Sequence, residues 1–508
     1  MKPFFIALLA VSSLSADPIA IGSRRELFVD DFLIEKLSGK AEQRLHHPQP
    51  QEIAITHDLP WEGSGSGYHS IFKDGDKYRM YYKSWQLTVT PDGKVNTGEH
   101  PLFCCYAESD DGIHWRKPEL GLHEFNGSKS NNIVIPHANM GDLKPDGGHP
   151  AVFKDDNPAA TPDAKYKAIV RSRGAKGLLA LKSADGLRWS PMADAPVITD
   201  GAFDSQNLAF WDAHSGQYRA YWRYFTAGVT DEKNWKPSGD RAIRTATSKD
   251  FIHWENHHDL SYVDSPSEQL YTNQVKPYHR APHLLLGFPT RYIERGWSES
   301  MRALPEREHR EWRSKASDRY GMVVTEGLFM ASRDGVTFKR WNEAFLPPGI
   351  ERPGTWNYGH QYIAWHLVET KSALDGAPNE LSLYAGENYW TGTSSELRRY
   401  TLRLDGFVSI HAPMNGGELI TKPITFTGKA LTMNFATSAA GDVKVEIQDA
   451  NGKPMPGFAL NDSEEHFGDS LERTVVWKTG SDVSSLAGKA VKLRFVLKDA
   501  DVYAIKFD

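Results

Sequence analysis

Carboxylates, amides, imidazoles and aromatic rings stand just before several apolar, strand-like stretches of this sequence. Four acids are candidate catalytic residues, namely Asp204, Glu268, Glu62 and Asp146. Nine further side chains are candidates for binding a substrate, namely Trp61, His69, His149, Gln206, Asn207, Tyr271, Asn273, Trp356 and His360. Two carboxylates can cleave a glycosidic bond, because one acid protonates the leaving oxygen while the other activates water or attacks the anomeric carbon. Aromatic rings suit stacking on the apolar face of a sugar, and amides and imidazoles suit binding its hydroxyl groups.

Each candidate acid also has a purely structural interpretation. Asp204 is of a type that caps turns through its side chain, but the two amides that follow it favour a functional role. Glu268 follows a loop-like Ser-Pro-Ser segment, and Glu62 precedes the glycine-rich segment 63–67, which would bring it near a ligand. Glu387, at the end of a predicted strand, is a weaker candidate.

A motif of the type Ser-x-Asp-Gly-x-x-Trp recurs along the chain and indicates where strands end. Its copies are residues 109–115, 183–189, 248–254 and 332–338. The third copy has Phe251 in place of the glycine. The Asp-Gly pair predicts a tight turn after a strand. The aromatic residue that ends the motif is expected to fold back and pack on that strand.

Upstream of these motifs, an apolar strand, a turn and a tyrosine-rich strand recur as a larger unit. Five such units lie around residues 70–82, 151–170, 208–222, 275–288 and 362–385. Read as blades, they predict an all-β chain with a five-bladed β-propeller, and a stack of β-sandwiches is the alternative. The stretch 26–34 is expected to pair with the last blade and close the ring. The starts of the innermost strands are then expected to face one funnel.

Three domains are predicted from these patterns: a signal peptide at 1–16, the propeller at 17–408 and a β-sandwich at 409–508. The first has a lysine, a short apolar run and small residues, which predicts export to the periplasm or the cell exterior. The last has about 100 residues of alternating strands, typical of a β-sandwich. We expect that sandwich to pack on the propeller. The charged stretch 294–318 is expected to be a solvated loop or the wall of a cleft.

Several of these stretches resemble the five-bladed propeller glycosidases, the superfamily that includes glycoside hydrolase families 32 and 43. The matching segments are 27–34, 60–62, 203–207, 210–212 and 352–356. The likeness is closer still to secreted proteins of polysaccharide-degrading bacteria. It implies a secreted glycoside hydrolase in which three acids from successive blades meet in the funnel. The alternatives are a non-catalytic glycan-binding protein, or a polysaccharide lyase with a His or Tyr base.

The resemblance assigns roles to two acids and leaves a third open. By position, Asp204 matches an inner-strand Asp, and Glu268 matches the general acid of a later blade. No Asp stands directly before Tyr68, where the acid of the first blade is expected. The candidates for that role are Glu62, Asp146, Asp30 and Asp31.

Composition and charge exclude several other classes of partner. A net charge of -6 gives no footprint for nucleic acid. No apolar run after the first residues approaches the roughly 18 residues of a membrane span.

Cys104 and Cys105 are adjacent, so they point to opposite faces of a strand and are expected to be buried without a disulfide. The sequence does not indicate an oligomeric state.

A carbohydrate is the expected partner, and no cofactor is expected. His69, His149 and His360 open three inner strands, but no ligand spacing supports a transition metal, and no Asp-rich loop demands calcium. Their expected role is contact with substrate or hydrogen bonding in the core. Four arginines close or follow strands, namely Arg171, Arg173, Arg223 and Arg291. If some of them reach the funnel, an anionic glycan is expected, because arginine binds such groups bidentately.

Overall fold

A computed structural model describes residues 17–508 with the exception of residue 232, so the predicted signal peptide lies outside the described residues. The protein is all-β, and the described residues contain three short α-helices. The chain divides into two compact units. The larger unit is Leu45–Phe407, and the smaller unit joins the described N-terminal residues up to Arg44 with Val408–Asp508.

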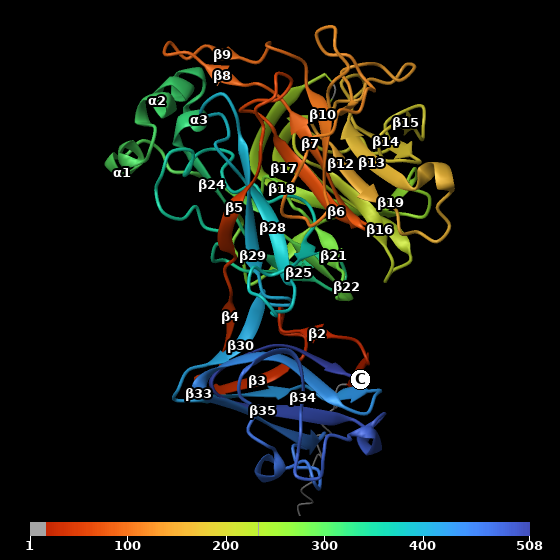
Figure 1. Cartoon of the computed structure of the whole chain (residues 1–508), viewed down its shortest axis with the longest axis vertical. Coiled ribbons are helices and arrows are strands. Elements are labelled where there is room, and N and C mark those ends of the chain that lie inside the picture. Colours follow the sequence, from red (N-terminus) through yellow and green to blue (C-terminus); the bar gives the residue numbers. More distant parts are fainter. Residues whose placement is uncertain (1–16, 232) are drawn as a thin grey trace, which may run out of the picture. The chain divides into compact units, whose positions relative to one another are not determined.

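Five sheets of four or five strands make up the larger unit (Figure 1). From one edge to the other, the first sheet contains β6 (Gly67–Asp74), β7 (Lys77–Ser84), β10 (Phe103–Ser109) and β11 (Ile133–Ile135). The second contains β12 (Ala151–Lys154), β13 (Tyr166–Arg171), β14 (Leu178–Ser183) and β15 (Ser190–Pro191). The third contains β16 (Leu208–Asp212), β17 (Gln217–Thr230), β18 (Trp235–Ser248) and β19 (Trp254–Asp259).

The fourth and fifth sheets complete the set. The fourth contains β21 (Lys276–Tyr278), β22 (Ala281–Gly287), β25 (Met330–Ser332), β26 (Thr337–Arg340) and β20 (Ser261–Val263). The fifth contains β27 (Val368–Thr370), β28 (Glu380–Glu387), β29 (Glu396–Leu402) and β5 (Gln49–Thr56). Two hairpins pair separately, β8 (Thr88–Val89) with β9 (Val95–Asn96) and β23 (Thr290–Glu294) with β24 (Val323–Gly327). Within the described residues of the larger unit, paired strands are antiparallel except β20 and β26.

An early strand does complete the last sheet, but it is not the predicted one. β5 pairs antiparallel with β29, so the start of the larger unit joins its end (Figure 1, red beside blue). The stretch 26–34 instead belongs to the smaller unit, where β2 (Glu26–Leu27) pairs with β35 (Val491–Phe507). Its apolar side chains, such as Phe28, are buried in the core of that unit, which decides the pairing.

The recurring motif forms the predicted tight turn in each copy. In the second copy, Gly186 N donates to Ser183 Oγ over 2.8 Å, and Leu187 N donates to Asp185 Oδ1 over 2.8 Å. Phe251 takes the glycine position of the third copy with a φ of 71°. The short polar side chains therefore satisfy the backbone donors of the turn.

The aromatic residues of the turns reach the preceding sheet, whereas the sequence predicted packing on their own strand. The rings that end the motif pair in three copies as Trp115 with Tyr384, Trp189 with Tyr81, and Phe338 with Tyr221. In the third copy Phe251, at the glycine position, pairs with Phe153, and the terminal Trp254 packs on Phe251. These pairs join sheet one to five, two to one, three to two, and four to three. Asp405, after β29, accepts a hydrogen bond from Tyr278 OH of sheet four over 2.8 Å. Each sheet therefore contacts the one before it, and the first contacts the last.

Two buried glutamines tie together the first segments of all five sheets. Gln206 Nε2 donates to Tyr68 O and Pro150 O, both over 3.0 Å. Gln274 Nε2 donates to Gln206 Oε1 over 2.8 Å and to Ile363 O over 2.9 Å. The five inner segments thus converge on one point, and Gln206 serves that convergence as a structural residue.

The charged stretch 294–318 is largely helical rather than a loop. It contains α1 (Glu299–Ala303) and α2 (Arg307–Ala316), and α3 (Asp318–Met322) follows. Arg310 and Arg313 are buried, and Arg313 Nη2 donates to Asn357 Oδ1 over 2.8 Å. A mixed pattern of buried and exposed charges explains why this stretch reads as a loop in sequence.

The smaller unit is built on one ten-stranded sheet. Its strands are β1 (Ile19–Gly22), β2, β3 (Ile34–Gly39), β4 (Glu42–Leu45), β30 (Val408–Ala412), β31 (Gly417–Thr421), β32 (Ile424–Phe426), β33 (Leu431–Asp449), β34 (Asp469–Thr474) and β35. β33 and β35 pair along most of their length and shift register between Thr437 and Asp442. The N-terminal strands thus extend a unit that the sequence assigned to residues 409–508 alone.

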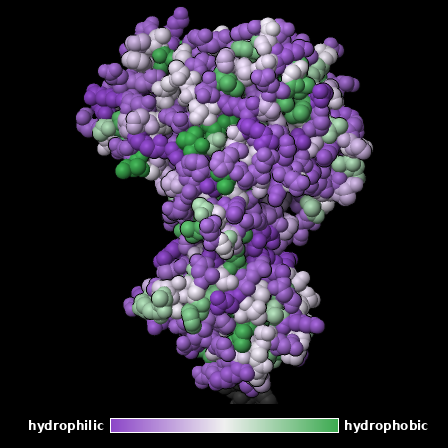
Figure 2. Space-filling view, viewed as in Figure 1, coloured by the Kyte–Doolittle hydropathy of each residue, from purple (hydrophilic) through white to green (hydrophobic). Residues whose placement is uncertain are grey.

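The remaining features concern surface and cysteines. Cys104 and Cys105 are buried and free, as predicted. Among the described residues, no helix has the length and apolar character that crossing a membrane requires. Figure 2 shows a face on which hydrophilic residues predominate and hydrophobic ones are scattered.

Candidate functional site

Three predicted side chains meet where the first strands of two neighbouring sheets begin. Asp146 and His149 precede β12, and Asp204 precedes β16. His149 Nδ1 lies 2.9 Å from Asp146 Oδ2, and His149 Nε2 lies 3.3 Å from Asp204 Oδ1. The side chains of Asp146 and His149 are 3% and 8% exposed, whereas that of Asp204 is 56% exposed. One imidazole therefore bridges a buried carboxylate and an open one.

The backbone around Asp146 fixes its carboxylate. Asp146 N donates to Arg171 O over 2.8 Å, and Gly148 N donates to Asp146 Oδ1 over 2.8 Å. A Cβ at Gly147 would lie 2.7 Å from the backbone nitrogen of Cys104, so this position requires glycine. The second carboxylate oxygen of Asp146 is left to receive the His149 proton.

Mutual charge keeps the cluster ionised despite its burial. Burial opposes the charge of Asp146, but His149 and Arg171 lower its pKa to about 2. The Asp204 side chain is 56% exposed, but the groups packed around it partly exclude water and so oppose its charge, while His149, Arg223 and Arg171 hold its pKa well below the usual range. Burial disfavours a charged His149, yet the two carboxylates raise its pKa above the ordinary value. The arrangement favours two carboxylates with an imidazolium between them.

Two arginines flank the open carboxylate, as the sequence suggested. Arg171 Nη1 lies 3.5 Å from Asp204 Oδ1 and 3.8 Å from Asp146 Oδ2. The Arg223 guanidinium lies 4.9 Å from the ring centre of Tyr271, and its Nε donates to Ala202 O over 3.1 Å. Arg171 is therefore free enough to contact a ligand at Asp204, whereas Arg223 is held in the wall behind it.

Tyrosine rings form a wall next to this cluster. Tyr68 lies 5.5 Å from the His149 ring and stacks on Tyr362 at 6.4 Å. Tyr271 lies 5.4 Å from Tyr362, and its hydroxyl is 3.3 Å from that of Tyr358. Burial raises the pKa of Tyr68, Tyr358 and Tyr362 well above 10, so their hydroxyls keep their protons. Such a wall suits the stacking and hydrogen bonding of a sugar ring.

A bulge in β6 turns Tyr68 toward the cluster. The pairing of β6 with β7 shifts register between Gly67 and Ser70, and Tyr68 has a φ of 53°. A bulge of this kind re-aims a side chain. The adjoining pocket is lined by Tyr68, Lys83, Tyr362 and Tyr389, among others.

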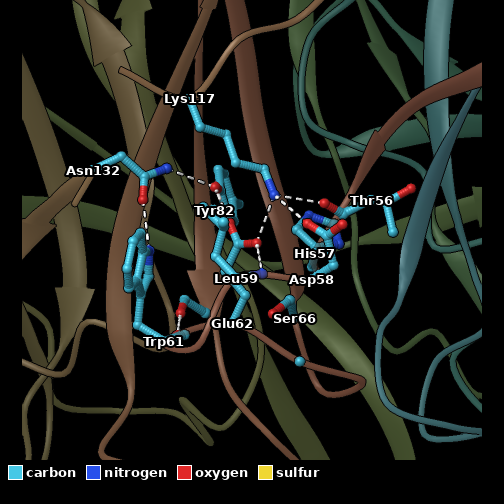
Figure 3. A network of polar contacts seen from close by, with 12 residues as sticks. Thr56, His57, Asp58, Leu59, Trp61, Glu62, Ser66, Tyr82, Lys117 and Asn132 are labelled. Carbon is cyan, nitrogen blue, oxygen red and sulfur yellow. Dashed lines mark hydrogen bonds and ion pairs between the residues drawn. The ribbon is translucent and has the colours of Figure 1, made fainter. Parts of the chain in front are cut away.

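The structure places Glu62 and Trp61 in a polar network with Tyr82, Lys117 and Asn132 (Figure 3). The Glu62 carboxylate lies 2.6 Å from Lys117 Nζ and accepts from Tyr82 OH over 2.5 Å. Trp61 Nε1 donates to Asn132 Oδ1 over 2.7 Å. Glu62 has no exposed surface. Its contacts are those of a structural ion pair rather than of a catalytic acid.

Glu268 is also bound by cations. Its carboxylate lies 3.1 Å from Arg291 Nη1 and 2.8 Å from Arg340 Nη2. Glu387 is fully buried and pairs with Arg352 and with Arg398 Nε, the latter over 2.9 Å. Neither of these carboxylates is free to act as the general acid that the resemblance implied for Glu268.

The three histidines do not converge. His69 lies 3.0 Å from His57, and His360 Nδ1 accepts from Trp356 N over 3.0 Å. His149 alone joins the carboxylates. Among the described residues, no cluster of three or more His, Cys, Asp or Glu side chains has the arrangement of a metal site.

The predicted amides also serve the protein itself. Asn207 Nδ2 donates to Phe203 O and Ser205 O, over 3.1 and 2.8 Å. Asn273 Oδ1 accepts from Val275 N over 3.3 Å. Trp356 Nε1 donates to Gly349 O over 2.8 Å. Of the predicted site residues, the structure brings together Asp146, His149, Asp204 and Tyr271.

Sequence reasoning missed Lys83 and the tyrosines Tyr358, Tyr362 and Tyr389. The signal for Lys83 was a charge near the end of β7 next to an apolar and aromatic run, and it is the buried one of the three charged residues of that strand. Tyr358 and Tyr362 stand at the start of the inner segment of the fifth unit, and Tyr389 follows the end of β28, where strand patterns gave no weight to single side chains.

Comparison with known proteins gives matches to solved structures only. No family model matches the chain, and no curated protein matches it. A structure named glycoside hydrolase is 14% identical, covering 70% of this chain and 92% of its own, with a TM-score of 0.42. A family 43 arabinoxylan arabinofuranohydrolase from Bacillus subtilis is 13% identical, covering 88% and 96%, with a TM-score of 0.41. An endo-arabinase from Bacteroides thetaiotaomicron is 12% identical, covering 69% and 98%, with a TM-score of 0.36. The function proposed below rests on the residues of the site.

Proposed function

We propose that Leu45–Phe407 is a five-bladed β-propeller whose funnel is the active site of a glycoside hydrolase. Support for five blades comes from the five sheets, from the contact of each sheet with the one before it, and from the junction at Gln206 and Gln274. A ring of blades of this kind leaves only short, protected sheet edges.

The main support for the proposed activity is the half-exposed carboxylate of Asp204, which lies next to this junction. Asp204 is held ionised by His149 and Arg171 and stands beside a wall of tyrosines. In the proposed reaction, Asp204 is the group that reaches the sugar. His149, charged between Asp146 and Asp204, supplies a proton through Asp204 and takes one back. Asp146 acts as a positioning residue for His149.

Overall, the glycosidic C–O bond breaks, the leaving oxygen gains a proton, and the hydroxyl of water adds to the anomeric carbon. The sugar ring lies against the tyrosine wall, where hydroxyls that keep their protons can donate hydrogen bonds. An acidic substrate would also give Arg171 a closer ion-pair partner, because Arg171 Nη1 lies 3.5 and 3.8 Å from the carboxylates of Asp204 and Asp146.

The test is hydrolysis of a panel of plant and algal oligosaccharides, measured as the release of reducing ends. Asp204→Asn is expected to lower kcat by about 10²- to 10⁴-fold, the usual contribution of a general acid or base. Asp194→Asn, an exposed Asp in the same unit, is the matched control and keeps full activity. Full activity of Asp204→Asn would refute the site. Binding without product release would favour a glycan-binding protein.

A second candidate function is a polysaccharide lyase, favoured by the contact of Tyr68 with His149 and by the cations beside it. In that reaction a base removes a proton next to a uronate carboxylate, and the leaving oxygen departs with the formation of a carbon–carbon double bond. The unsaturated product absorbs ultraviolet light, so the same panel, read by absorbance, distinguishes elimination from hydrolysis.

A further inference from the structure

Lys83 is a buried cation without a counter-ion in contact. It lies in β7, is 4% exposed, and makes no side-chain hydrogen bond or ion pair with any residue that the structure describes. Its Nζ instead lies 4.7, 5.1 and 5.3 Å from the ring centres of Tyr68, Tyr389 and Trp85. Rings attract a cation but do not accept three strong hydrogen bonds, so the ammonium donors remain available.

Lys83 lines a small pocket of about 30 Å³, and Tyr68 connects this pocket to the His149–Asp204 cluster through its ring contact with His149. Tyr68, Tyr362 and Tyr389 line that pocket together with Lys83. Burial lowers the pKa of Lys83 to about 8, while the charges of Asp204 and Asp146 act to raise it. An ammonium that is desolvated in this way gains most from an anion that enters the pocket.

The local charge balance is positive although the chain as a whole is negative. Six cationic groups stand against four carboxylates here, namely Lys83, Arg171, Arg223, His149, Arg352 and Arg398 against Asp146, Asp204, Glu387 and Glu396. The protein has a net charge of -6. Two glutamates also line the pocket, but arginines bind Glu387, and Asn388 Nδ2 donates to the carboxylate of Glu396 over 2.7 Å. A local positive excess in an acidic protein favours binding of anions.

We propose that Lys83 binds an anionic group of the sugar, so that the glycan accepted at this site is acidic. The group is a carboxylate of a uronic acid or a sulfate ester, since either offers charged oxygens to an ammonium held as a point charge. The inference rests on the proposed function in that the sugar occupies the site beside Asp204.

Binding to the full-length chain by calorimetry tests the proposal. The probes are oligogalacturonides, the same chains with their carboxyl groups reduced to alcohols, carrageenan oligosaccharides, and the same chains after desulfation. All measurements use the Asp204→Asn background, so that binding is compared without turnover. We expect at least one acidic probe to bind, and Lys83→Met to weaken it about tenfold to a hundredfold, the scale of a charge-assisted hydrogen bond. Comparison of the carboxylated oligogalacturonides with the sulfated carrageenan oligosaccharides shows whether Lys83 binds a carboxylate or a sulfate.

The stability of the free protein gives an independent readout. Lys83→Met removes a buried charge that has no partner, so it is expected to raise the melting temperature. A lysine that only supports the structure would lower it. Lys129→Met, the same substitution at an exposed position of the same unit, should change neither binding nor stability.

Several results would overturn the proposal. These are equal binding of acidic and neutral probes, no binding of any acidic probe, or unchanged binding by Lys83→Met. If Lys83→Met in the chain with Asp204 intact loses turnover of a neutral glycan but keeps its binding, Lys83 is instead a proton donor. The proposed function fails separately, if Asp204→Asn still cleaves its substrate.

Discussion

Replacing Lys117 with Met leaves the Glu62 carboxylate buried without its ion-pair partner. The Glu62 side chain is 0% exposed, and that of Lys117 is 15% exposed. The Glu62 carboxylate lies 2.6 Å from Lys117 Nζ. Burial already raises the pKa of Glu62, and Lys117 is the main influence that lowers it. Removing one partner of a buried pair costs about 3–5 kcal/mol.

Protonation of Glu62 gives the same magnitude by a second route. Without Lys117, the carboxyl group takes up a proton in the folded state. Holding that proton costs about 1.4 kcal/mol for each pH unit above an ordinary Glu pKa of about 4.3, hence about 4 kcal/mol at pH 7 and about 1 kcal/mol at pH 5. The folded variant then binds more protons than the unfolded chain, so its stability falls as the pH rises.

Urea unfolding between pH 5 and pH 8, followed by tryptophan fluorescence, measures this dependence. Lys117→Met should be destabilised by about 3–4 kcal/mol at pH 7, and by much less at pH 5. Adding Glu62→Gln should restore most of the loss at pH 7, because a neutral amide needs no counter-ion. The exposed Lys129→Met is the control. An equal defect at both pH values, or a double variant no more stable than the single one, would refute the reasoning.

Three further predictions concern the junction, the site and the repeated turns. Gln206→Leu should lower the free energy of unfolding by about 2–4 kcal/mol in urea, because buried carbonyls lose their donor and Gln274 loses one of its two acceptors. Asp146→Asn should destabilise the fold most between pH 3.8 and pH 6.5. In the unmodified protein, the lowered pKa of Asp146 contributes stability that is lost as the pH falls toward 2. The raised pKa of His149 contributes stability that is lost as the pH rises above 6.5. A pH-independent difference would contradict this. Asp185→Ala should cost about 1–2 kcal/mol by thermal unfolding, because two backbone donors of the turn lose their acceptor, and a neutral result would show that water replaces it.

Local patterns determined the strands and the turns of this protein. The alternation of apolar residues and the Ser-x-Asp turns are properties of short segments, so the sequence could indicate the five repeating units and the turn hydrogen bonds. It also pointed to Asp146, His149 and Asp204, because residues just before inner strands are brought together wherever those strands converge. The pairing of Asp146 with His149 is local, within an Asx turn, whereas the contact of His149 with Asp204 depends on the convergence of the two inner segments.

Tertiary structure decided everything that depends on which segments meet across long distances. Glu62 and Asp146 look alike in sequence, but Lys117 neutralises the first in a closed network while His149 connects the second to an open carboxylate. The stretch 26–34 and β5 are both early and strand-like, and only the cores that they bury show which of them closes the fifth sheet. Lys83 is one of three cationic residues in its strand, and only the tertiary structure surrounds it with rings from other segments and buries it. Pairing of this kind is set by burial over the whole chain, which no local pattern records.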